Sequence, residues 1–148
     1  MSELRLISAD EIPLLIPLAR EFFASGEIAA KLNENHFIET FKAQIESGNV
    51  FVIVAGIPIR GTIAGVIHTD PFGGELTCSE LWWFVRKEER GSIGLRLFNE
   101  WEVEAKSRGA VRFLMAHLNG SRNDSLDNLF ERKGYSKKEQ IFAKEVSV

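Results

Sequence analysis

The 148-residue chain has the length of one domain, and its 45% hydrophobic and 26% charged residues are typical of a globular protein. A formal net charge of −3 excludes the strongly basic surface on which non-specific nucleic-acid binding depends, so we expect no nucleic-acid partner. The longest apolar stretch, Val50 to Ile59, is about half of the roughly 20 residues that cross a bilayer. With no membrane span and no secretory signal in view, we expect a cytoplasmic protein and one domain over residues 1–148.

The first third of the chain predicts one strand and two helices. Alternation around Leu4 and Leu6 indicates a short first strand. Ser8 begins a capping box, and apolar residues at helical spacing follow it. A proline inside a helix lacks the N–H that the helix needs, so we expect the regular part of this helix to begin near Pro17. A second helix is predicted from His36 to Ser47.

The middle of the chain predicts a sheet with one parallel crossover. Runs of β-forming residues from Asn49 to Ala55, from Thr62 to His68 and from Leu76 to Val85 are separated by short turns, which indicates antiparallel strands. A helical pattern from Gly91 to Ser107 then leads to another apolar run, Val111 to Leu118. Strand, helix and strand in this order predict a parallel pair.

The last 30 residues predict one more helix and one more strand. The helix spans Asn123 to Lys133, with Ser121 or Asn123 as its N-cap and Gly134 after its end. A final strand around Gln140 to Val146 is expected to close the sheet. The fold class is therefore α/β, with a mixed, mostly antiparallel sheet flanked by helices on both faces.

The segment from Phe84 to Leu95 is the strongest candidate for a binding site. It runs from a buried strand through a charged loop into a helix, whose first N–H groups lack carbonyl partners and attract anions. Gly91 and Gly94 would let a phosphate approach the backbone, although they could equally form a tight turn against the sheet. Arg90 and Ser92 would add donors.

The order of elements and this loop resemble the GNAT superfamily of N-acetyltransferases over nearly the whole chain. The family signature is Gln or Arg, two residues, Gly, one residue, and Gly or Ala. Residues Glu89 to Gly94 are similar to it, with Glu89 at the basic position and Ser92 at the first glycine. The variant is similar to phage-encoded and prophage-encoded members.

A second block supports the same resemblance. Asn123, followed by the run from Leu129 to Tyr135, is similar to the family's Asn, spacer and Leu-Tyr-Glu-Lys-x-Gly-Phe. The resemblance implies acetyl-CoA as cosubstrate and a strand-helix-strand unit that binds it between two splayed strands. The cofactor-binding residues that it implies are Phe84 and Val85 at the pantetheine arm, Arg90, Gly91, Ser92, Ile93, Gly94 and Leu95 at the phosphates, and Asn123 and Phe130 on the last helix.

Acetyl transfer to an amine needs a proton acceptor, because an ammonium group has no lone pair. Glu80 is the first candidate, since its apolar neighbours could raise the pKa of its carboxyl, and an ordinary ion-paired carboxylate is the alternative. His117 is the second candidate, with a structural histidine as its alternative. Phe130 stands where many members carry a tyrosine that protonates the leaving thiolate, and Tyr135 occupies the position of a packing aromatic.

Other residues offer less. Cys78 has no local activating partner and is expected to be a small buried residue, and the three histidines have no metal-site spacing. The predicted function is acetyl-CoA-dependent transfer to a primary amine, on a small molecule or a peptide, with a homodimer possible. A CoA-binding or phage/host interaction module with impaired catalysis is the alternative. A P-loop enzyme is excluded because the glycine loop lacks the Gly-Lys-Ser/Thr ending.

Overall fold

The computed structural model describes residues 3–25, 31–117 and 123–147. The chain divides into two compact units, residues 1–116 and residues 117–148, and each is described by itself. The first unit holds the whole sheet and three α-helices, and the second holds one α-helix and the C-terminal segment. In the residues that the model describes, no helix is both long and apolar enough to cross a membrane.

The N-terminal elements form as predicted. Strand β1 (Leu4–Leu6) is followed by the 3-10 helix η1 (Ala9–Leu15) and by helices α1 (Ile16–Ala24) and α2 (Glu34–Glu46). The capping box is present, because the Ser8 backbone N–H donates to the Glu11 carboxylate at 3.1 Å. Pro17 lies in the first turn of α1, where its missing N–H is tolerated, so the α-helix begins where the proline predicts.

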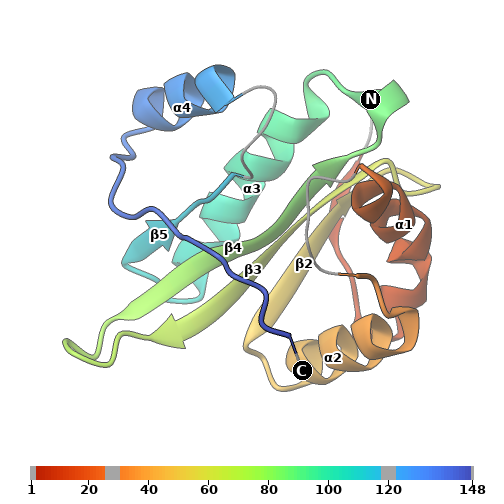
Figure 1. Ribbon diagram of the computed structural model, residues 1–148, viewed down its shortest axis with the longest axis horizontal. Helices are drawn as coiled ribbons and strands as arrows, with labels where there is room; N and C mark the ends of the chain where they lie inside the picture. The colour runs from red at the N-terminus through yellow and green to blue at the C-terminus, as the bar shows by residue number, and fades with distance from the viewer. Residues whose placement is uncertain (1–2, 26–30, 118–122, 148) are drawn as a thin grey trace. The chain divides into compact units, whose positions relative to one another are not determined.

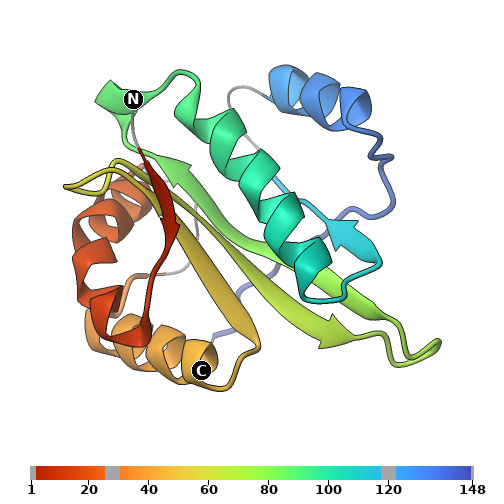
Figure 2. The ribbon, with the colours of Figure 1, turned by 180° about the vertical axis from the view of Figure 1, so that it is seen from behind.

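The first unit contains a five-stranded mixed sheet in the order β1-β2-β3-β4-β5 (Figures 1 and 2). Strands β2 (Val50–Ala55), β3 (Gly61–Thr69) and β4 (Leu76–Val85) pair antiparallel, as predicted. The short 3-10 helix η2 (Lys87–Glu89) and helix α3 (Ile93–Ser107) follow β4 and lead to β5 (Arg112–Leu114), which pairs with β4 in parallel. The predicted fold class is confirmed.

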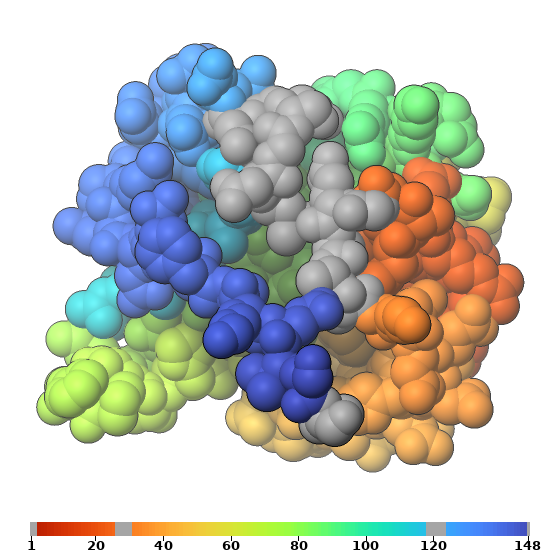
Figure 3. All heavy atoms as spheres, viewed as in Figure 1, coloured from red at the N-terminus to blue at the C-terminus, as the bar shows by residue number. Residues whose placement is uncertain are grey.

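Helices cover both faces of this sheet, because its strands carry apolar side chains on both sides. Val50, Val52 and Val54 of β2 pack with η1 and α1 in one core cluster. Phe51 points to the other face, where its ring lies 6.5 Å from that of Trp101 on α3. The residues of the N-terminal third, red to orange, gather on one side of the space-filling view (Figure 3).

A bulge in β4 interrupts the register with β3. Gly65 pairs with Glu80 and Ala64 pairs with Trp82, so Leu81 is the extra residue. A bulge bends its strand and increases its twist. Strand β5 pairs only with Thr77, Cys78 and Ser79, which lie before the bulge, and it is therefore shorter than the predicted run from 111 to 118. Leu118 lies outside the described residues.

In the second unit, helix α4 (Asn123–Arg132) forms as predicted, and Gly134 follows its end at a φ of +91°. Ser121, one of the two predicted caps, lies outside the described residues. The prediction of a final strand at 140–146 is wrong, because residues 136–147 contain no helix and no paired strand. Ile141 and Phe142 are 81% and 86% exposed. Residues 140–146 have high β-propensity, but propensity belongs to single residues. A strand also needs a neighbouring strand whose backbone pairs with it through hydrogen bonds.

Candidate active site

The candidate site begins where β4 and β5 stop pairing, and we call this place the fork. The last paired residues are Ser79 and Leu114, while β4 continues to Val85. Glu80 is the first residue of β4 beyond the pairing. Its carboxylate accepts a hydrogen bond from the backbone N–H of Ala116, which follows β5. Glu80, the residue before the bulge at Leu81, therefore has its carboxyl group at the fork.

The environment of Glu80 favours the neutral acid. Burial raises the pKa of its carboxyl to about 7, and the hydrogen bond from Ala116 opposes that shift without cancelling it. An ion-paired carboxylate would show the opposite shift, so the alternative interpretation of Glu80 loses its support. A carboxyl that titrates near neutral pH can both take up and release a proton under ordinary conditions.

The backbone beyond the fork leads directly to a helix N-terminus. After β4 ends at Val85, η2 and the residues Arg90 to Ser92 turn the chain into α3. The first N–H groups of α3 have no carbonyl partner within the helix. The Ser92 side chain, at the N-cap, makes no capping hydrogen bond, so its hydroxyl is not used to satisfy them. These groups together form a donor set suited to an anion.

The glycines of this segment are not required by the local fold. A Cβ at Gly91 would meet no atom within 4 Å, and neither Gly91 nor Gly94 has a positive φ. A Cβ at Gly94 would lie 3.7 Å from Val85 Cγ2 and 3.9 Å from the Trp83 ring, which are ordinary contacts. The tight-turn interpretation therefore explains neither glycine, whereas the close approach of a ligand to the backbone explains both.

Several predicted cofactor-binding side chains are buried in the core. Phe84, Val85 and Ile93 are 8%, 9% and 9% exposed, and the Phe84 ring lies 5.4 Å from the Phe22 ring of α1. Only their backbone groups are available to a ligand. Leu95 on α3 is 44% exposed.

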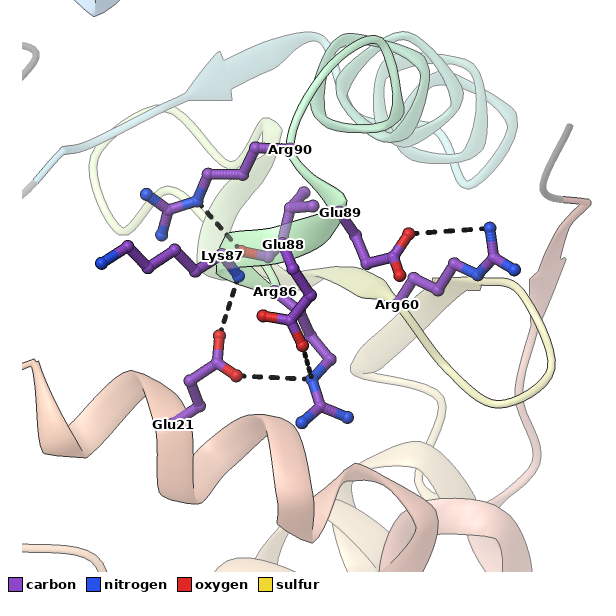
Figure 4. Close-up of polar contacts among 8 residues, drawn as sticks. Glu21, Arg60, Arg86, Lys87, Glu88, Glu89 and Arg90 are labelled. Carbon is purple, nitrogen blue, oxygen red and sulfur yellow. Dashed lines mark hydrogen bonds and ion pairs between the residues drawn. The ribbon is translucent and has the colours of Figure 1, made fainter.

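Ionic contacts hold the loop between β4 and α3 (Figure 4). The Arg90 Nε donates to the Val85 carbonyl at 3.2 Å, and its guanidinium lies 5.8 Å from the centre of the Phe84 ring. Glu89 pairs with Arg60 at 3.6 Å. The side chains of Lys87 and Arg90 extend to the same side of the loop in Figure 4, so two cationic groups face one region of solvent.

The second unit contains the remaining candidates. His117 Nε2 lies 2.8 Å from Asp127 Oδ1, and its ring stacks on Phe130 at 6.1 Å. This arrangement agrees with the structural alternative for His117. The Phe130 ring also lies 5.9 Å from the Tyr135 ring, as expected for a packing aromatic. Asn123 is the first residue of α4, and the structure describes only its backbone.

Cys78, two tryptophans and His68 have structural roles. Cys78 is fully buried, and burial raises the pKa of its thiol to about 12, so it is no nucleophile at neutral pH. The Trp101 indole donates to the Ala64 carbonyl in the core. Trp82 is 6% exposed and packs against Phe22 and Phe37. His68 contacts Ser79 at 2.9 Å on the surface.

The architecture matches solved structures over almost its full length. A predicted acetyltransferase from Clostridium acetobutylicum, crystallised with acetyl-CoA, matches with a TM-score of 0.79 and 14% identity, covering 98% of this chain and 96% of that chain. An acetyltransferase from Trypanosoma brucei matches with a TM-score of 0.75 and 14% identity over 99% and 100% of the two chains. The chain has the GNAT fold.

A third structure with the GNAT fold contains a bound small molecule. It is an aminoglycoside acetyltransferase from an uncultured soil metagenomic sample in complex with sisomicin, with a TM-score of 0.73 and 16% identity over 99% of this chain and 96% of that chain. No family model matches the sequence, and no curated protein matches it. The GNAT fold is thus evident in three dimensions at identities where sequence comparison finds nothing.

Sequence reasoning missed one residue of the site. Glu21 on α1 accepts a hydrogen bond from the Lys87 backbone N–H at 2.9 Å and pairs with Arg86 at 3.4 Å. Its partners are 65 and 66 residues away in the chain, so no local motif could have indicated the contact.

Proposed function

We propose that this protein is an acetyl-CoA-dependent N-acetyltransferase that transfers an acetyl group directly to a primary amine. The observation that carries the proposal is Glu80, a carboxyl with a pKa of about 7 placed at the fork of a GNAT fold. Beyond that fork, the same strand leads to the exposed N–H groups and the two spare glycines at the start of α3. A proton acceptor and an anion-binding segment therefore lie on one continuous stretch of chain.

Acetyl-CoA fits the donor set at the start of α3. Its diphosphate would accept from the backbone N–H groups of Gly91 to Leu95, with the Ser92 hydroxyl and the cations of Lys87 and Arg90 adding charge and donors. Gly94 would allow the close approach. The backbone of Phe84 and Val85 would accompany the pantetheine arm.

Glu80 would act as the proton acceptor for the amine. Acetyl-CoA supplies the acetyl group as an activated thioester. The Glu80 carboxylate takes a proton from the ammonium of the acceptor, directly or through a water, and so frees the nitrogen lone pair. The new C–N bond forms as the C–S bond breaks. The nitrogen then loses a second proton, which balances the proton that the CoA thiolate takes up, and the proton held by Glu80 is released to solvent.

Phe130 has no proton to give to the thiolate. A thiol has an ordinary pKa near 8.5, so a thiolate is a fairly good leaving group and can take its proton from water. The proposal therefore needs no general acid from the chain.

Two titrations and one assay test the proposal. Calorimetry should show binding of acetyl-CoA to the wild-type protein and its loss in a folded Gly94→Trp variant, because the indole would fill the space that the phosphates need. Release of CoA thiol should then be measured with a panel of small amines, aminoglycosides and lysine peptides. Absence of binding by the wild-type protein would overturn the proposal.

The acceptor is an amine on a small molecule or a peptide. The aminoglycoside acetyltransferase structures with this fold put polyamine antibiotics on the panel, and the net charge of −3 favours a cationic acceptor weakly. A response to aminoglycosides alone would narrow the class to these small molecules.

A CoA-binding module without catalysis is the second candidate. Phe130 at the position of the family's tyrosine favours it, because a hydroxyl has been lost there. Binding of acetyl-CoA without release of CoA thiol for any amine on the panel would support this candidate. Steady turnover with one amine would exclude it.

A further inference from the structure

We propose that Glu21 is a positioning residue that holds the loop between β4 and α3 in the geometry required for binding acetyl-CoA. This inference rests on the proposed function. It concerns a side chain on α1, which belongs to another part of the sequence and carries none of the predicted binding groups.

The loop needs a partner for its own backbone. Lys87 is the first residue of η2, and the first N–H groups of a helix have no carbonyl partner within it. Arg86, the N-cap, supplies no side-chain hydrogen bond. Glu21 supplies the missing side-chain partner from α1, because its Oε2 accepts a hydrogen bond from the Lys87 N–H at 2.9 Å. The carboxylate thus caps a helix that lies 66 residues further along the chain.

The second oxygen of the same carboxylate binds the preceding side chain. Glu21 Oε1 lies 3.4 Å from Arg86 Nε, and both side chains are about one-third exposed. The Arg86 backbone N–H donates to the Arg60 carbonyl at 2.9 Å on the opposite side, beside the ion pair between Arg60 and Glu89. Figure 4 shows Glu21 beneath the loop and Arg60 beside it. The loop is therefore held from two sides, by α1 and by the turn before β3.

The contacts with Glu21 and Arg60 determine which groups of the loop can reach a ligand. With its N–H bound to Glu21, Lys87 extends its amine to the side on which Arg90 also extends (Figure 4). The residues from Gly91 to Leu95 follow immediately and begin α3. A change in the Lys87 peptide would rotate both the cations and the start of α3, so binding of the diphosphate depends on a carboxylate that does not touch it.

The test compares three changes at this contact. Glu21→Ala removes both bonds and should raise the dissociation constant for acetyl-CoA about tenfold. Glu21→Gln keeps an oxygen for the Lys87 N–H and should restore the affinity to within about threefold of the wild type. Arg86→Ala removes the ion pairs with Glu21 and Glu88 but keeps the hydrogen bond from the Lys87 N–H to Glu21, and it should have a small effect, since ion pairs that solvent can reach contribute little.

A matched control and an independent readout accompany these variants. Glu34→Ala breaks the exposed pair with Arg20, the neighbour of Glu21 on α1, and should leave acetyl-CoA binding unchanged. Hydrogen exchange in the unliganded protein should show the Lys87 amide losing protection in Glu21→Ala and keeping it in Glu21→Gln. A merely structural role would lower the thermal midpoint without the selective change in affinity.

The outcomes separate this inference from the proposed function. Equal binding of acetyl-CoA by Glu21→Ala and the wild type would overturn the positioning role and leave the proposed function intact. Equal losses in Glu21→Gln and Glu21→Ala would also overturn it, because the hydrogen bond to Lys87 would then not matter. A wild-type protein that does not bind acetyl-CoA would overturn both.

Discussion

The pKa of Glu80 depends on its position at the point where two strands, β4 and β5, stop pairing. Its sequence neighbours are apolar, but its raised pKa arises from burial at the fork, where the Ala116 backbone N–H donates to it. A pKa raised to about 7 lies in the range useful for amine chemistry.

The raised pKa makes the stability of the protein depend on pH. The carboxyl has an ordinary pKa of 4.5 and a pKa of about 7 in the folded protein, so the folded state binds this proton more tightly than the unfolded state does. The contribution of Glu80 is therefore fully present below pH 4.5 and is lost as pH rises through about 7, by up to about 3 kcal/mol. Urea titrations of the wild type and Glu80→Gln from pH 4 to pH 8 give the free energy of unfolding at each pH. Between pH 4.5 and pH 7 this free energy should fall more steeply with pH in the wild type than in Glu80→Gln.

The same titration predicts the pH dependence of activity. Activity should rise with pH to a plateau above about 7, because only the ionised carboxylate accepts the proton. Glu80→Gln should lower kcat by about 10²-fold or more and remove this rise, with binding of acetyl-CoA unchanged. An unaltered pH profile in Glu80→Gln would assign the proton acceptor to another group.

Gly65 is required by packing on the face covered by α3. A Cβ at this position would lie 2.6 Å from the Phe51 ring and 2.8 Å from the Trp101 indole nitrogen, and both rings are buried. Gly65→Ala should therefore lower the free energy of unfolding by about 1–3 kcal/mol or more. Gly91→Ala, which meets no atom, is the control, and equal stability of the two variants would contradict the packing account.

At the scale of elements, β4 and α3 carry the candidate site. The pairing of β4 with β5 ends at Ser79, just before the bulge at Leu81, and the loop after Val85 turns the chain into the first N–H groups of α3. The strand therefore positions Glu80, and the helix supplies the anion-binding groups. Helix α1 joins them through Glu21.

A substitution of Gly94 shows whether this glycine is needed for the stability of α3 or for binding a ligand. Alanine is favoured over glycine inside a helix by about 1 kcal/mol, and a Cβ at this position would make only ordinary contacts. Gly94→Ala should therefore keep or raise the thermal midpoint and at the same time weaken binding of acetyl-CoA. A lower midpoint would show that the glycine serves packing after all.

At the scale of the whole molecule, the two units differ in how well their residues are buried. The first unit has a core on both faces of its sheet, whereas residues 136–147 of the second unit are exposed and belong to no helix or paired strand. The backbone of such a segment is open to proteases.

Limited digestion with trypsin should reveal this difference. The first cuts should follow Lys137, Lys138 or Lys144, which lie in the exposed segment. The sites within the strands and helices of the first unit should be cut later, because cleavage there requires those elements to open. Mass spectrometry of early fragments measures the order, and a first cut within residues 31–116 would contradict the prediction.

Much of the fold could be predicted from the sequence because local rules act on neighbouring residues. Pro17 marked the start of α1, the spacing of apolar residues marked α2 and α3, and the run from Leu76 to Val85 matched β4 at both ends. The donor-rich start of α3 was likewise visible in Arg90 to Gly94, since glycine and a helix start are adjacent in the chain.

Tertiary structure decided what depends on residues far apart in the chain. The final strand at 140–146 had the right pattern, yet the structure gives it no paired neighbour. The pKa of Glu80 depends on burial and on Ala116, and the loop depends on Glu21. Periodicity and capping are properties of a local segment, whereas desolvation, register and long-range hydrogen bonds exist only when the chain brings distant segments together.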